Sequence, residues 1–338
     1  MSPRISATAL LLAAVGVPLS LLWDYSWEST IGVDLFWSPP HMATFLAVLL
    51  AALSALALAI RERATKPVGA WLALWGAVAF VTAVSFDLWW QASYGLAAGI
   101  WHPPQLLKAA AFFAITIGAW LCAPRSGAAA VLALIGVVTL PLTFANQQHS
   151  APFFLAACAT YPLILAAASA SGGRFAATRA ALGYTLLVGA MVWLLPLFPA
   201  SPLTGPIYHP RDHLLPPPFP LLLIAPALAV DLLRARPARG GDWIAAIEAG
   251  LAFFVVFTAV QWTFASFLLS PAADNRFFAG GGRQWPFFMQ IHPSALTTFW
   301  KVPGEEFTLP RAVTAAALAL LATRLGLALG RRMQPLHR

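Results

Sequence analysis

The chain has 338 residues, of which 60% are hydrophobic and only 9% are charged, and its mean hydropathy is +0.76. This composition excludes an ordinary soluble domain, so we expect the apolar runs of about 20 residues to be membrane-spanning helices. The formal net charge is +8. Because the basic residues gather in short connections between apolar runs, we attribute this charge to membrane topology and not to nucleic-acid binding. The predicted partner of the chain is therefore the lipid bilayer.

The apolar runs predict an all-α, polytopic helical bundle in which about ten transmembrane helices form a single membrane domain, 1–338. Helices are expected as the spanning element because lipid offers no hydrogen-bond partner to exposed backbone groups. The expected spans are 6–23, 41–60, 69–91, 105–123, 127–145, 152–170, 180–199, 217–234, 243–269 and 309–330.

The connections between these spans alternate between basic ones and ones rich in Trp, Pro, His and acidic residues. The positive-inside rule places the basic set, and both termini, in the cytoplasm. This predicts a protein of the bacterial cytoplasmic (inner) membrane whose functional face points outward, where nearly all the histidines fall. The basic residues are Arg4, Arg61, Arg63, Lys66, Arg125, Arg174, Arg179, Arg234, Arg236, Arg239, Arg331, Arg332 and Arg338.

The connection after the first span, within 23–41, carries three potential metal ligands. Asp24 and Glu28 are four residues apart, which places both carboxylates on one helix face. Like charges at this spacing repel each other unless a cation or a shared proton lies between them. His41 follows a Pro-Pro pair that can begin the next helix. These residues predict a metal site at the membrane edge, and the alternative is an interfacial cap with an aromatic belt formed by Trp23, Trp27 and Trp37.

The same pattern recurs about sixty residues later in the sequence FDLWWQASYGLAAGIWHPPQ. Asp87 aligns with Asp24, and Pro103-Pro104-Gln105 aligns with Pro39-Pro40-His41. We therefore predict a tandem helical-hairpin repeat in the first four helices, with repeat 1 at 6–61 and repeat 2 at 69–123. Gln91 and Gln105 replace the Glu and the His, and Gln is a poor metal ligand. The second copy, with Asp87, Gln91 and Gln105, is thus expected to be structural or a weaker site.

A few ionisable residues lie inside apolar runs, where a charge is costly and usually paired. Lys108, near the start of the fourth span, has Asp87 as its expected partner, and the alternative is that its side chain extends to the membrane surface. Asp231 and Glu248 lie toward the inner side. Arg324 in the last span is expected to balance one of these two carboxylates.

Two further outer connections carry candidate groups. His209 and His213 are four residues apart, a spacing used by zinc-binding helices. Pro210 lies between them and more prolines follow, so a regular helix is not expected and a rigid Pro-rich cover is the stronger interpretation. The connection 270–309 is long and aromatic. It is predicted to form a cap on the outer face between the last two helices.

The stretch 24–41 resembles the C subunit of the copper membrane monooxygenases, the family of particulate methane and ammonia monooxygenases. The resemblance covers eighteen residues, and in the family an Asp and two His residues at these positions bind copper. It therefore implies Asp24, Glu28 and His41 as ligand positions. Glu28 departs from the family's His, and a carboxylate favours harder ions such as zinc, manganese or iron over copper. The matching positions are Asp24, Ser26, Trp27, Glu28, Asp34, Trp37, Ser38, Pro39 and His41.

These observations lead to one main functional expectation and two alternatives. The resemblance implies a membrane protein with a metal at the outer edge, copper or alternatively zinc or iron, that oxidises a small apolar substrate. The first alternative is a non-catalytic structural subunit that binds no metal and assembles with other membrane subunits. The second is a transporter in which Asp24, Asp87 and Lys108 line a gated path. No pair of broken helices near mid-membrane is evident in the sequence to support a transporter.

Overall fold

The computed structural model describes residues 3–32, 36–62, 67–95, 102–123, 127–144, 148–201, 212–236, 241–279 and 304–333. Within these ranges the chain is all-helical and forms no β-strand, which confirms the predicted class. Two isolated bridges join Ser150 to Glu306 and Pro199 to His213. The helices are α1 (Pro3–Thr30), α2 (Pro39–Arg61), α3 (Val68–Tyr94), α4 (Pro103–Cys122), α5 (Gly127–Phe144), α6 (Ala151–Ser171), α7 (Ala176–Leu194), η3 (Leu195–Leu197), α8 (Ile224–Arg234), α9 (Asp242–Leu268), η4 (Pro271–Ala273) and α11 (Leu309–Met333).

Eight of these helices are long and apolar enough to cross a membrane: α1 to α4, α6, α7, α9 and α11. They match eight of the ten expected spans, and α5 matches a ninth as a shorter apolar helix. The remaining expectation, a continuous helix over 217–234, is wrong. Helix α8 begins only at Ile224 and has 11 residues. A proline disfavours the helical conformation of the residue before it, so the four prolines between 216 and 220 oppose an earlier start of the helix.

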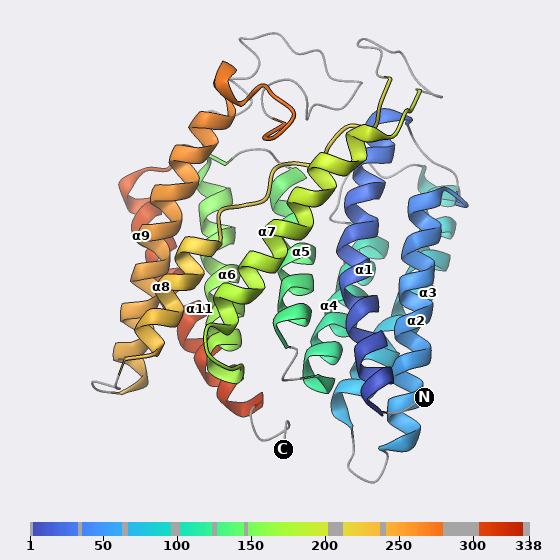
Figure 1. The fold of residues 1–338 in the computed structure, drawn as a ribbon, viewed down its shortest axis with the longest axis horizontal. Helices are drawn as coiled ribbons and strands as arrows, with labels where there is room; N and C mark the ends of the chain where they lie inside the picture. Colours follow the sequence, from blue (N-terminus) through green and yellow to red (C-terminus); the bar gives the residue numbers. More distant parts are fainter. Residues whose placement is uncertain are drawn as a thin grey trace.

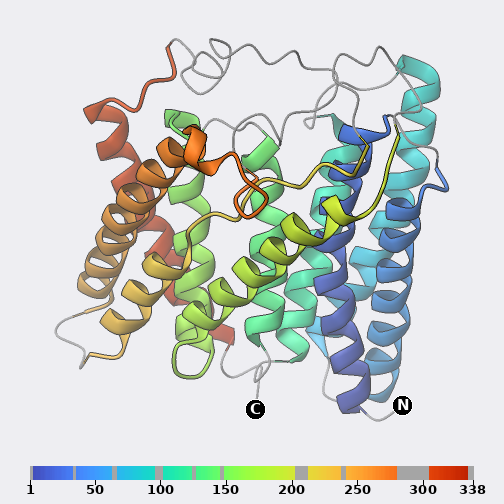
Figure 2. The same ribbon diagram turned by 45° about the horizontal axis from the view of Figure 1, so that its top comes forward.

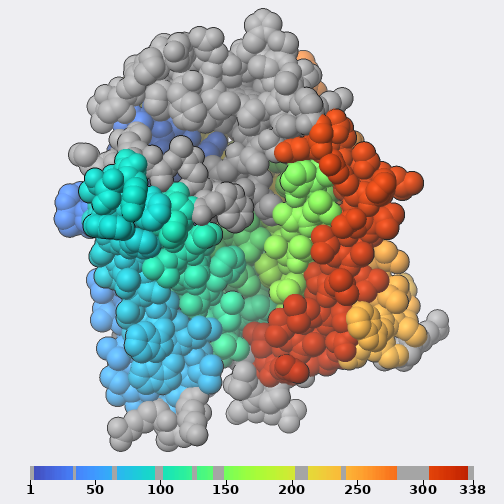
Figure 3. All heavy atoms as spheres, turned by 180° about the vertical axis from the view of Figure 1, so that it is seen from behind, coloured from blue at the N-terminus to red at the C-terminus, as the bar shows by residue number. Residues whose placement is uncertain are grey.

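The helices form two groups, with α5 and α7 between them (Figure 1). The N-terminal group consists of α1 to α4, and the C-terminal group of α6, α8, α9 and α11. Seen from behind, α11 flanks one side of the molecule and the early helices flank the other (Figure 3). The start of α1 and the end of α11 lie at the same end of the bundle (Figure 1). We call this the inner end, after the topology prediction, and the opposite end the outer end.

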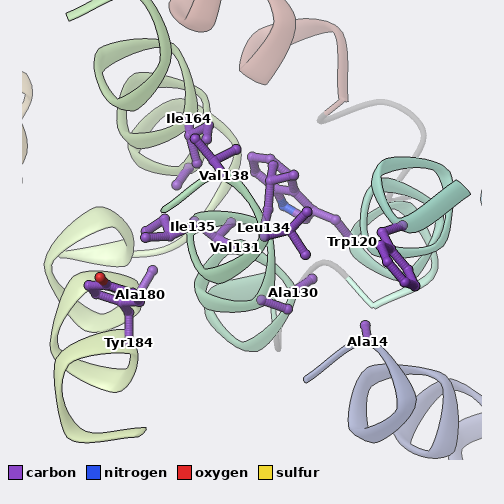
Figure 4. Packing of buried hydrophobic residues seen from close by; sticks show 14 of the residues in the cluster. Ala14, Trp120, Ala130, Val131, Leu134, Ile135, Val138, Ile164, Ala180 and Tyr184 are labelled. Atoms are coloured by element: carbon purple, nitrogen blue, oxygen red, sulfur yellow. The ribbon is translucent and has the colours of Figure 1, made fainter. Parts of the chain in front are cut away.

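Small residues let the helix pairs approach closely, as is usual where lipid gives no hydrophobic drive for helix association. In α4, a Cβ added at Gly118 would lie 2.6 Å from the backbone N of Ala73 and the O of Gly69 in α3. In α5, a Cβ at Gly136 would lie 2.7 Å from Pro18 Cβ in α1. Helix α5 also packs against α6 and so joins the two groups. Its own side chains Val131, Leu134, Ile135 and Val138 are buried there (Figure 4).

A non-helical segment, residues 213–223, crosses the front of the bundle before α8 begins (Figure 2), and it is largely buried from Leu214 onward. Its backbone N–H groups donate to groups of other elements, as a buried non-helical chain requires. Leu214 N donates to Phe198 O at 3.0 Å and Leu222 N to Gln261 Oε1 of α9 at 2.9 Å. Leu221 N donates to Tyr184 OH of α7 at 3.3 Å. The prolines, which have no N–H group, lower the number of donors that must find a partner.

The helices that begin at the outer end share one start. Helices α2, α4, α6 and α11 all carry proline at their second residue, which suits a position whose N–H has no partner inside the helix. A residue of capping type precedes three of them, and His102 precedes the fourth. The third helical residue differs from helix to helix. These residues are His41, Gln105, Phe153 and Arg311, so the same backbone start presents four different side chains.

Candidate functional site

The structure brings together two of the three predicted metal ligands. Asp24 lies near the end of α1 and His41 in the first turn of α2, and these two helices pack along their length. Asp24 Oδ1 is 3.6 Å from His41 Nε2, with side chains 20% and 33% exposed. Two ligands of one ion with bonds of about 2.0–2.2 Å are roughly 3.0–3.6 Å apart. The pair thus has a separation that suits a shared ion.

Glu28 lies one turn beyond Asp24 on α1 and is exposed. Among the residues that the structure describes, no three His, Cys, Asp or Glu side chains lie close enough together to hold a metal ion. Glu28 is therefore not placed with Asp24 and His41 as a complete three-residue site. The donor set fits a metal as an Asp–His pair, to which Glu28 remains a predicted third ligand.

Aromatic rings surround the Asp24–His41 pair on the side of α2. The His41 ring stacks on Phe45 at 6.2 Å between centroids, and Phe45 lies 5.1 Å from Phe36. Trp37 contacts Phe36 edge-on at 4.7 Å and is 71% exposed. The surroundings of His41 are thus apolar on one side and open to solvent or the membrane surface on the other.

Repeat 2 places its residues in the same order along a similar hairpin but makes a different interaction. Lys108 Nζ donates to Asp87 Oδ2 at 2.5 Å, which confirms the expected pair. Gln91 Nε2 donates to the same oxygen at 3.1 Å. The Asp87 side chain is only 8% exposed. The carboxylate of repeat 2 is therefore buried and already neutralised by a cation of the chain itself.

The position of Lys108 distinguishes the two repeats. Lys108 follows Gln105 by three residues, and Thr44 follows His41 by three residues. Thr44 is buried and its Oγ1 lies 2.9 Å from Ser20 Oγ, one turn before Asp24 on α1. In repeat 1 this position thus carries a neutral hydroxyl where repeat 2 carries an ammonium group.

The end of α1 that carries Asp24 also binds the non-helical segment. Ser26 Oγ donates to Leu215 O, and Leu215 N donates to Thr30 Oγ1 at 2.8 Å. Both side chains are buried. Motion of segment 213–223 would therefore act on the same helical turns that present Asp24 and Glu28.

The other predicted candidates give mixed results. His213 Nδ1 lies 3.0 Å from Asp212 Oδ1 in an exposed, non-helical connection, which agrees with the expectation against a helix there. His209 and most of the predicted cap, 280–303, lie outside the described residues. At the described end of the cap, Ala151 N donates to Glu305 O at 2.8 Å, so this connection binds the start of α6. The Glu306 carboxyl accepts hydrogen bonds from the backbone N–H groups of Glu306 and Gly304, which lower its pKa.

The prediction that Arg324 balances Asp231 or Glu248 is wrong. Arg324 Nη2 lies 3.5 Å from Asp242 Oδ2 at the start of α9. Asp231 instead accepts hydrogen bonds from Thr178 N at 2.8 Å and Thr178 Oγ1 at 2.7 Å. Asp242 is the first residue of α9, at the inner end, and so lies outside the apolar runs from which the expected partners were drawn.

Sequence reasoning missed a polar cluster in the C-terminal group. Gln261 Nε2 donates to Gln148 Oε1 at 2.7 Å, and both residues are buried. His149 Nε2 lies 3.0 Å from Ser266 Oγ, and its ring contacts Trp262 edge-on at 4.7 Å. The signal in the sequence is Gln261, an amide in the middle of an apolar run, where an unpaired polar side chain would be costly.

The chain matches no protein-family model, no curated protein and no solved structure. The arrangement of its residues is therefore the basis for the functional proposal. In class, this is an all-helical protein whose apolar helices suit a lipid bilayer.

Proposed function

We propose that this chain is an integral membrane protein that binds a metal ion at the outer end of α1 and α2, with Asp24 and His41 as ligands and Glu28 as the third. The single observation that carries the proposal is the 3.6 Å separation of Asp24 Oδ1 and His41 Nε2. These residues are seventeen positions apart in sequence, and they meet at the pair of positions that the resemblance to the copper monooxygenase C subunit implies.

Copper is the ion we propose first, with zinc or iron as the alternative that Glu28 favours. A copper or iron ion at this place would supply the redox chemistry for oxidation of a small apolar substrate. The residues of the chain would bind the ion and orient the substrate. Asp24 and His41 present an oxygen and a nitrogen donor to the ion. Phe36, Trp37 and Phe45 supply the aromatic surface that a small apolar molecule would contact.

Repeat 2 supports the proposal by contrast. Its carboxylate, Asp87, holds the Lys108 ammonium group, whereas Asp24 has no lysine at the equivalent position. In repeat 1 the residue that faces the carboxylate is instead His41, whose imidazole can serve as a metal ligand.

The test is metal analysis of the purified full-length protein after growth with copper, zinc and iron. We expect stoichiometric metal in the wild type and its loss in His41→Ala and Asp24→Asn. Gln105→Ala is the matched control, because Gln105 occupies the position of His41 in repeat 2 and should leave the metal content unchanged. Absence of metal from the wild type after reconstitution with each ion, or equal metal in His41→Ala, would contradict the proposal and favour the non-catalytic subunit.

A transporter is the second candidate, and one observation favours it. Segment 213–223 is a non-helical stretch, largely buried from Leu214 onward, that leads into the short helix α8, and membrane transporters place such interrupted helices at their substrate sites. Uptake into vesicles containing the purified protein is the test. The vesicles are tested for uptake of the copper, zinc or iron ion itself. Uptake that is retained in His41→Ala and lost in Gln261→Leu would support a transporter over a fixed metal site.

A further inference from the structure

The inner end of the C-terminal group carries a cluster of arginines around one carboxylate. Arg331 of α11 binds Asp242 of α9 through two hydrogen bonds, Nη1 to Oδ1 at 2.5 Å and Nη2 to Oδ2 at 2.6 Å. Arg324, two turns earlier on α11, approaches the same carboxylate at 3.5 Å. Arg234, the last residue of α8, also interacts electrostatically with Asp242. Two guanidinium groups therefore contact a single carboxylate and a third acts on it electrostatically, which leaves an excess of positive charge.

The carboxylate does not use all the hydrogen-bond donors of this cluster. The Nε atoms of Arg234 and Arg324 are buried and have no hydrogen-bond acceptor among the described residues. A buried donor without an acceptor is unfavourable, and guanidinium groups pair with phosphate oxygens through two parallel hydrogen bonds. An added phosphate group would thus supply acceptors that the chain itself lacks here.

The surroundings of the cluster are those of a membrane surface. Trp243, next to Asp242, is 54% exposed, and Arg324 Cζ lies 5.4 Å above its ring. Trp is typical of the level of the lipid headgroups. From the cluster toward the middle of the bundle, both helices expose large apolar side chains. These are Ile244, Ile247 and Leu251 on α9, and Leu321, Leu325 and Leu329 on α11.

We propose that this arginine cluster binds the headgroup of an anionic phospholipid, whose acyl chains lie against the exposed apolar residues of α9 and α11. The combination of excess positive charge, an interfacial Trp and apolar residues directly below it fits a phospholipid better than a free anion, which would need only the charge. Glu248, the next carboxylate on α9, lies six residues from Asp242, or about 9 Å along the helix, and so outside the headgroup level. This site is independent of the metal site at the outer end.

The experiment measures binding of labelled phosphatidylglycerol and phosphatidylcholine to the full-length protein in vesicles of phosphatidylcholine. Each arginine near an anionic surface contributes roughly fivefold in affinity. We therefore expect a preference for phosphatidylglycerol in the wild type that falls roughly 25-fold in the double variant Arg234→Gln/Arg324→Gln. Arg61→Gln is the matched control, because Arg61 ends α2 at the same end of the bundle but belongs to the N-terminal group. This variant should keep the preference for phosphatidylglycerol.

Two further measurements keep the proposal falsifiable if the double variant does not fold. Asp242→Asn removes the competing carboxylate, so it should keep or raise the preference for phosphatidylglycerol. Inorganic phosphate added to the detergent-solubilised wild type should not raise its unfolding temperature, whereas phosphatidylglycerol should. The proposal is overturned by equal affinity for the two lipids, by an equal loss in Arg61→Gln, by a loss of preference in Asp242→Asn, or by stabilisation with free phosphate.

Discussion

The two N-terminal hairpins, which we predict to be repeats, place their carboxylates in different surroundings. In α1–α2, Asp24 is partly exposed and faces a histidine; in α3–α4, Asp87 is buried and faces a lysine and a glutamine. Both second helices begin at a Pro-Pro pair, and the two carboxylates differ in the side chains around them. The Asp87 carboxylate is paired with a cation of the chain and so stabilises the fold, whereas we propose that the carboxylate beside His41 takes an external ion.

The largest effect on stability is expected from breaking the pair formed by Asp87 and Lys108. Lys108→Met leaves the Asp87 carboxylate buried without its cation, so we expect a loss of about 3–5 kcal/mol in the free energy of unfolding. The double variant Asp87→Asn/Lys108→Met removes both charges and should recover most of this loss. Chemical denaturation in detergent measures both. A loss in Lys108→Met that the second substitution leaves unchanged would show that the lysine acts through packing and not through its charge.

The Asp87–Lys108 pair is an example of a contact that could be predicted from the sequence alone. The partner of Lys108 follows from the cost of a lone charge in an apolar run, and the approach of Asp24 and His41 follows from their positions at two facing helix ends. The non-helical segment 213–223 could not be predicted in this way. An apolar run with several prolines has the composition of a spanning helix. The hydrogen bonds that help it remain extended include those to Ser26, Thr30, Tyr184 and Gln261, which are far away in sequence.

The next effect concerns the link between repeat 1 and segment 213–223, which has no counterpart among the described residues of repeat 2. Thr30→Val removes the acceptor of the buried Leu215 N–H. We expect a loss of about 1–3 kcal/mol in the free energy of unfolding. Thr82→Val is the matched control, because Thr82 on α3 is exposed and bonds only to Val78 O, at 3.1 Å. Equal losses in the two variants would mean that the effect is one of helix propensity and not of the link.

A smaller change in stability, with a large change in binding, is expected when repeat 1 receives the lysine of repeat 2. Thr44→Lys places an ammonium group on the turn that faces Asp24 and removes the contact between Thr44 and Ser20. The lost hydrogen bond should cost about 0.5–1.5 kcal/mol. Metal content should fall to the background level, since the ammonium group competes for the carboxylate. Retention of metal in a folded Thr44→Lys protein would show that Asp24 is not a ligand.

The smallest effect on stability is expected from His41→Gln, which gives repeat 1 the residue of repeat 2 at this position. The Asp24–His41 contact is 3.6 Å long and partly exposed, and such contacts contribute about 0–1 kcal/mol. Without metal, the variant and the wild type should therefore unfold at nearly the same temperature. With metal, only the wild type should gain stability, because an ion bound to the native state alone stabilises it by mass action. A variant that gains as much as the wild type would place the ion elsewhere. An apo wild type much more stable than the variant would make His41 a structural residue, as Lys108 is in repeat 2.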